Sequence, residues 1–198
     1  IEADRLYLCI EAGALIQSLD GGATWVDRTP DSPIDTHTLA IHPLAPGRLY
    51  SAAGDGFWKP GSGYAESHDR GETWTRIADG LTHHYLFGLA VATADPDTVL
   101  VSAASTAMLA HDPTNAESYV YRRSGGGSWE LAMGGLPAAQ GMTIPTLAAH
   151  PTQDGVFYAA SNQGVFRTGD AGRSWETVPI PWPPHYQFRN AHSLALAA

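Results

Sequence analysis

The chain has 198 residues, of which 43% are hydrophobic and 16% charged, a composition typical of one folded domain with a sizeable core. Its formal net charge of −9 argues against nucleic acid or an anionic membrane as the main partner. No apolar run approaches the ~20 residues that a membrane-spanning helix needs, and the single cysteine, Cys9, excludes an internal disulfide.

The sequence starts almost at once on a predicted strand, "RLYLCIEAG" at residues 5–13, and no signal peptide is visible. The cysteine count leaves the cellular compartment open. The absence of a visible leader slightly favours the cytoplasm.

Short runs rich in β-branched and aromatic residues, separated by Gly, Pro and Asp, predict strands along the whole chain. The first set has three strands, at residues 4–13, 14–18 and 24–29. Three sets of four follow, at residues 36–43, 47–54, 64–67 and 73–78, at 86–93, 97–105, 119–124 and 128–133, and at 144–151, 155–161, 164–168 and 174–179. A last run, "AHSLALAA" at 191–198, matches the first strand of each set. Four short strands repeated about every 50 residues indicate an all-β propeller of four-stranded antiparallel blades.

One motif joins the third and fourth strands of each set, as "SLDGGATW" (18–25), "SHDRGETW" (67–74), "TGDAGRSW" (168–175) and a degenerate "RRSGGGSW" (122–129). The Asp and the hydroxyl residue can bind turn amides, the Gly tolerates positive φ, and the Trp can wedge between blades. One carboxylate per motif is too few for a calcium site. The residues assigned this structural role are Ser18, Asp20, Gly22 and Trp25, Ser67, Asp69, Gly71 and Trp74, Trp129, and Thr168, Asp170, Gly172 and Trp175.

This motif resembles the Asp-box, or BNR, repeat of sialidases, some xyloglucan-cleaving hydrolases, sortilin-type receptors and photosystem II assembly factors. The whole chain looks most similar to bacterial WD40/YVTN/BNR-like repeat proteins, which are often labelled glycosyl hydrolases. The resemblance implies a ring of six or seven blades. It leaves the activity undecided, because enzymes and non-enzymes share the repeat.

We expect one domain over residues 1–198, with blade units at about 1–30, 31–81, 82–137 and 138–182. Residues 190–198 then supply an inner strand that either closes a four-bladed ring or begins a further blade. We favour the second arrangement, an arc of a larger ring. Its open edges would invite pairing with another chain, so a homo-oligomer is expected.

The long loops gather on the face opposite the Asp boxes, around the channel mouth, and such loops are more often functional than regular turns. His37 and His192 occupy equivalent places there, two residues before Leu39 and Leu194. Two interpretations of the histidines are open: a metal or ligand site of His37, His84 and His192, with His83 or His185, or polar side chains that pack the loops. No closely spaced metal-binding motif supports the first interpretation, so we predict no metal and no cofactor. The ligand-binding candidates are His37, Trp58, His84, Tyr85, Tyr186, Arg189 and His192.

We predict a non-catalytic binding or scaffold propeller that recognises a carbohydrate or a protein on this loop face. The alternative is a BNR-type glycoside hydrolase, which needs two carboxylates across a cleft. The candidate acids on this face, Asp35, Asp55, Asp112 and Glu117, match no hydrolase motif, and the first three are the best of them.

Overall fold

The computed structural model describes residues 3–27, 29–183, 185 and 189–197. Within these residues, strands form three four-stranded antiparallel sheets and one two-stranded sheet, which we call blades 1 to 4 in chain order. Blade 1 holds β1 (Leu6–Ile10) and β2 (Ala14–Ser18). Blade 2 holds β3 (Thr36–His42), β4 (Ala45–Ala53), β5 (Tyr64–Ser67) and β6 (Thr75–Arg76). Blade 3 holds β7 (Tyr85–Val91), β8 (Val99–Ala104), β9 (Ser118–Arg123) and β10 (Glu130–Leu131). Blade 4 holds β11 (Thr146–Ala149), β12 (Phe157–Ser161), β13 (Gly164–Thr168) and β14 (Glu176–Thr177).

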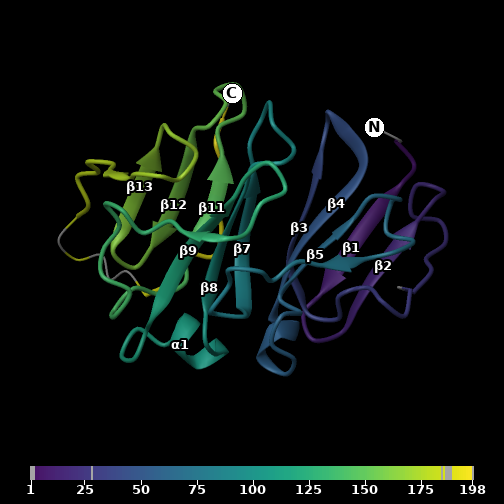
Figure 1. Ribbon diagram of the computed structural model, residues 1–198, viewed down its shortest axis with the longest axis horizontal. Helices are drawn as coiled ribbons and strands as arrows, with labels where there is room; N and C mark the ends of the chain where they lie inside the picture. The colour runs from purple at the N-terminus through teal and green to yellow at the C-terminus, as the bar shows by residue number, and fades with distance from the viewer. Residues whose placement is uncertain (1–2, 28, 184, 186–188, 198) are drawn as a thin grey trace.

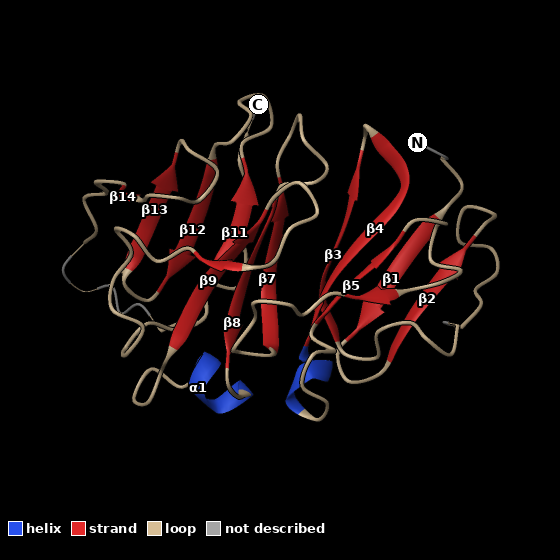
Figure 2. Ribbon diagram, viewed as in Figure 1, coloured by secondary structure: helices blue, strands red, loops and turns tan. Residues whose placement is uncertain are grey.

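Each four-stranded sheet pairs its strands in chain order, and β3, β7 and β11 lie side by side as inner strands (Figure 1). The predicted all-β fold of four-stranded blades is therefore confirmed. A short 3₁₀ helix, η1 (Gly54–Phe57), and a short α-helix, α1 (Ala107–His111), lie at the same end of the strands (Figure 2). No helix in the described residues is long and apolar enough to cross a membrane.

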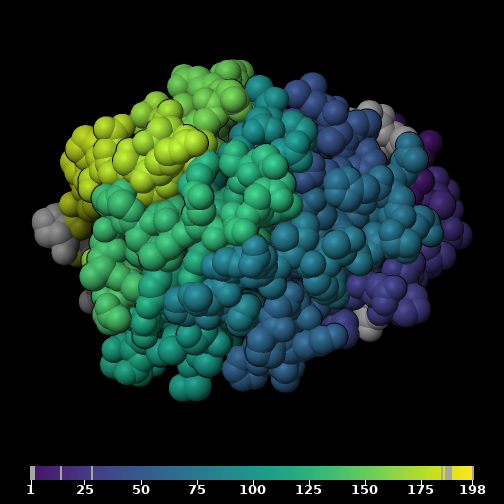
Figure 3. All heavy atoms as spheres, viewed as in Figure 1, coloured from purple at the N-terminus to yellow at the C-terminus, as the bar shows by residue number. Residues whose placement is uncertain are grey.

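The core lies between the blades, because each sheet turns one face to the blade before it and the other to the blade after it. Tyr50 and Tyr64 of blade 2 pack with Val101 and Trp129 of blade 3. On the other face of blade 3, Leu100 packs with residues of blade 4 such as Phe157. Figure 3 shows the colours following one another across the surface, as this neighbour-to-neighbour packing requires.

The Asp boxes are tight turns held by side-chain hydrogen bonds. The backbone N–H and hydroxyl of Thr24 donate to the Asp20 carboxylate at 2.8 and 2.6 Å, and Gly22 N–H donates to Ser18 Oγ at 2.8 Å. The turns around Asp69 and Asp170 repeat the same bonds. These bonds give the side chains of the motif a structural task in the turn.

The box tryptophans behave in two ways. Trp129 and Trp175 are only 3% and 6% exposed, and their indole N–H groups donate to Ile77 O and Ala132 O of the preceding blade. Trp25 and Trp74 instead donate to Gly22 O and Gly71 O within their own turns, and both are partly exposed. The wedge between blades is therefore formed by two of the four tryptophans.

A buried ionic cluster joins blades 2 and 3. Glu66 on β5 is 2% exposed and accepts hydrogen bonds from Arg123 of blade 3 at 2.8 Å and from Tyr64 OH at 2.7 Å. Arg48 Nη2 lies 2.7 Å from the other Glu66 oxygen, and His68 Nε2 lies 3.3 Å from it. The carboxylate is thus fully partnered, as a buried charge must be.

Both ends of the arc differ from the regular four-stranded pattern in the described residues. Blade 1 has only β1 and β2, with Val26 bonded to Gln17 in place of a further strand. Residues 191–197 form no strand, in contrast to the expectation, because no strand pairs with them in the described part of the chain. Thr146 Oγ1 donates to Ala191 O, which places this segment beside β11.

Candidate functional site

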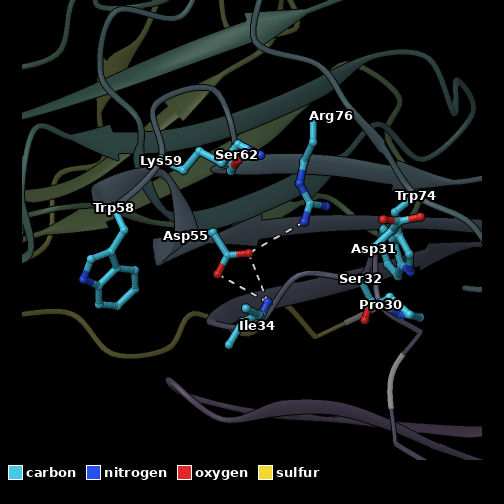
Figure 4. Close-up of a pocket in the computed structure, with 10 residues that line it drawn as sticks. All are labelled: Pro30, Asp31, Ser32, Ile34, Asp55, Trp58, Lys59, Ser62, Trp74 and Arg76. Carbon is cyan, nitrogen blue, oxygen red and sulfur yellow. Dashed lines mark hydrogen bonds and ion pairs between the residues drawn. The ribbon is translucent and has the colours of Figure 1, made fainter.

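A cavity of about 510 Å³ lies at the junction of blades 1 and 2. The loop after Val26, the loop around η1 and the start of β6 enclose it, so it faces the loop side of the arc. Its lining residues are Pro30, Asp31, Ser32, Ile34, Asp55, Trp58, Lys59, Ser62, Trp74 and Arg76 (Figure 4).

Two tryptophans give the cavity its apolar surface. Trp58 follows η1, is 68% exposed and contacts Phe57 edge-on. Trp74 is the second tryptophan of the lining and is labelled in Figure 4. Such indoles offer flat faces on which a sugar or another ring can stack.

The charged groups of the cavity balance one another, with Lys59 and Arg76 against Asp31 and Asp55. Asp55 is held by the backbone N–H groups of Ile34 at 3.0 Å and Asp35 at 2.8 Å, and lies 3.8 Å from Arg76 Nη2. Burial lowers the pKa of Arg76, while the charges of Asp55 and Asp31 oppose that change. Arg76 Nη1 is buried and has no hydrogen-bond partner in the described residues.

A second polar cluster lies near the inner strands, at the expected channel mouth. His37 Nδ1 donates to Leu86 O at 2.6 Å, and its ring packs against Tyr85 and Phe87. Tyr85 OH lies 3.1 Å from Nε2 of His111, a residue on α1. Burial raises the pKa of Tyr85, with Asp35 and Glu11 adding to the shift, and burial lowers the pKa of His111.

The structure thus brings His37 and Tyr85 together and adds His111, which the sequence analysis missed. His111 belongs to no repeat position, since it sits in a helix inserted between β8 and β9. His192 is exposed, and it adds to the lowering of the pKa of His111 that burial causes. His37 and Tyr85 are not among the residues that line the cavity.

The other predicted binding residues are dispersed. His84 presents its backbone to Gly56 and Gly63, where a Cβ would fall within 1.8 and 2.2 Å of His84 O. His83 stacks on Tyr119 at 3.8 Å between ring centroids. Arg189 is exposed, and Tyr186 lies outside the described residues. No group of three or more His, Cys, Asp or Glu side chains in the described residues could hold a metal ion.

Asp35, Asp55 and Asp112 are bound to backbone amides, whereas Glu117 accepts hydrogen bonds from the side chains of Tyr119 and Gln140. Asp35 Oδ1 accepts the Ala12 N–H at 2.6 Å, and Asp55 accepts the two amides given above. Asp112 caps a turn by accepting the Thr114 N–H, which lowers the pKa of its carboxyl. The lowered pKa makes Asp112 unsuited to act as a glycosidase acid, which must keep its proton at neutral pH.

Comparisons with known proteins support the fold and leave the activity open. No protein-family model matches the chain. The chain is 26% identical over 173 residues to a xyloglucanase from Hypocrea jecorina (strain QM6a), covering 86% of this chain and 17% of that enzyme.

Two solved structures extend the comparison. An ancestral GH74 enzyme superposes with a TM-score of 0.71 at 12% identity, covering 91% of this chain and 23% of the other. YCF48 bound to D1 peptide superposes with a TM-score of 0.54 at 13% identity, covering 88% and 50%. The chain therefore matches a fragment of larger propellers and spans less than a quarter of the curated xyloglucanase.

Proposed function

We propose that this chain is the ligand-binding part of a β-propeller that holds a neutral carbohydrate in the cavity between blades 1 and 2. The observation that carries the proposal is the lining of that cavity, which combines two tryptophans with a balanced set of charges. Sugars are bound by such a combination, because ring faces stack on indoles while hydroxyl groups bond to carboxylates and guanidinium groups. The likeness to a xyloglucanase supports the choice of a plant-type glucan as the first probe.

Calorimetric titration with xyloglucan oligosaccharides tests the proposal. We expect saturable binding, and we expect Trp58→Ala to weaken it by about tenfold, the effect of removing one central aromatic contact. Trp182→Ala is the matched control, because Trp182 is also exposed but does not line the cavity. No heat from the unmodified chain, or equal losses in both variants, would contradict the proposal.

Hydrolysis of the same glucan is the second candidate, favoured by the sequence match to a xyloglucanase over most of this chain. Asp35 and Asp55 accept backbone N–H groups at 2.6 and 2.8 Å, and these bonds hold the two carboxylates in place. A second catalytic group would then come from a longer protein. We expect the chain alone to release no reducing ends from xyloglucan, and steady release that Asp35→Asn abolishes would favour the enzyme.

A further inference from the structure

The junctions between blades 2 and 3 and between blades 3 and 4 are closed by the same backbone hydrogen bond. Trp129 N–H donates to Asp79 O and Trp175 N–H donates to Gly134 O, both at 2.8 Å. The residues that follow these acceptors, Gly80 and Gly135, have φ of +89° and +92°. A Cβ on either glycine would lie 2.1 Å from the carbonyl oxygen of the incoming tryptophan. Only glycine permits this approach.

The junction between blades 1 and 2 lacks this backbone hydrogen bond in the described residues. Asp31 follows Trp25 at the same spacing at which Gly80 follows Trp74 and Gly135 follows Trp129. Asp31 is absent from the residues with positive φ, and no backbone bond joins Trp74 N–H to Pro30 in the described part of the chain. The indole N–H of Trp74 donates to Gly71 O within its own turn, and the cavity lies at this junction.

We propose that Asp31 keeps this junction open as a ligand site, and that the ligand is a pyranose ring that enters the gap and stacks on the indole of Trp74. This inference rests on the proposed function and specifies how the sugar is held. One observation limits the chemistry of the ligand: the balanced charges of the lining favour a neutral group. Arg76 also lines the cavity, so its guanidinium can donate a hydrogen bond to a sugar hydroxyl.

The test compares Asp31→Gly with Asp31→Ala. Alanine keeps the Cβ that blocks closure, whereas glycine permits the turn found at Gly80 and Gly135. In calorimetric titrations with xyloglucan oligosaccharide, we expect Asp31→Gly to bind at least about tenfold more weakly than Asp31→Ala, a difference of ~1.4 kcal/mol. We also expect the Trp74 indole to become buried in Asp31→Gly, shifting its fluorescence to shorter wavelength. Adding Trp74→Phe to this variant should remove the shift.

Equal binding by the two variants, without a fluorescence shift, overturns the role of Asp31 while the proposed function stands. Failure of the unmodified chain to bind overturns the proposed function and the sugar assignment together. The fluorescence comparison needs no ligand, so in that case it still decides whether Asp31 holds the junction open. Circular dichroism of each variant verifies that the blades have formed.

Discussion

At the scale of single residues, the box aspartates combine solvent exposure with strong local bonding. The pKa of Asp20 and of Asp69 is lowered to about 2, first by the hydroxyl groups and then by the backbone N–H groups of Thr24 and Thr73. At Asp170 burial raises the pKa, and the donors of Ser174 and Thr168 outweigh it to give about 2. Each carboxylate therefore prefers the folded turn only while it is ionised.

This preference predicts acid sensitivity. A carboxyl whose pKa is lower in the folded than in the unfolded chain stabilises the fold fully above pH about 4, and the contribution is lost as the pH falls towards 2. We expect urea midpoints to fall over this range and to fall less steeply in Asp69→Asn. Glu72→Gln, in the same turn, is the control. An unchanged slope in Asp69→Asn would show that this carboxylate does not link folding to pH.

The residue scale also shows what the sequence could and could not predict about the site. Trp58 was identified as a binding candidate because it is aromatic and lies in a long loop. Arg76 and Trp74 were not, because both lie where the repeat predicts strand and wedge positions. The missing signal was the aspartate in place of glycine at residue 31, which the spacing from Trp25 reveals once the blades are aligned.

At the scale of the structural elements, the buried ion pair of Glu66 on β5 with Arg123 on β9 joins blades 2 and 3. Removing one partner of a buried ion pair leaves an uncompensated charge and costs ~3–5 kcal/mol, whereas an exposed pair contributes at most ~1 kcal/mol. Glu66→Gln should therefore lower the free energy of unfolding severalfold more than Glu130→Gln. Glu130 pairs with Arg122 at 2.7 Å but is an exposed partner, which makes it a matched control. Denaturant unfolding measures both variants, and similar losses of unfolding free energy would show that the buried ionic cluster contributes no more than the exposed pair.

Most of the elements followed from the sequence, because strand alternation and the Asp-box turns are local signals. The strands of blades 2 to 4 and their antiparallel pairing follow from that pattern. The behaviour of residues 191–197 did not, because a strand depends on a partner as well as on its own residues. The helix α1 was also not predicted, because it lies in an insertion between β8 and β9 and the repeat contains no helix.

At the scale of the whole molecule, blade 1 presents an uncovered apolar face. Leu6, Leu8 and Ile10 are 39%, 47% and 46% exposed, whereas Leu49, which pairs with Ser67 as Leu6 pairs with Ser18, is 1% exposed. The face has the character of a surface between blades. We expect the isolated chain to cover it by self-association.

Light scattering after size exclusion tests this expectation. The unmodified chain should elute as a dimer or larger species, and Leu8→Asp should shift it towards a monomer near 21.0 kDa. Leu44→Asp is the control, because Leu44 is 66% exposed and lies in the turn between β3 and β4, outside this face. A monodisperse monomer from the unmodified chain would contradict the expectation.

Packing only between neighbours in sequence also determines how the molecule opens. Blades 2 and 3 are covered on both faces, whereas blades 1 and 4 are each covered on one. In such a linear array, stability is a sum of intrinsic and nearest-neighbour terms, so the outer units detach before the inner ones. Amide hydrogens of β4 and β8 should thus exchange with solvent most slowly and those of β1 earliest. The arc would lose its order from the ends inward, and the open junction beside Asp31 is where the first unit would separate.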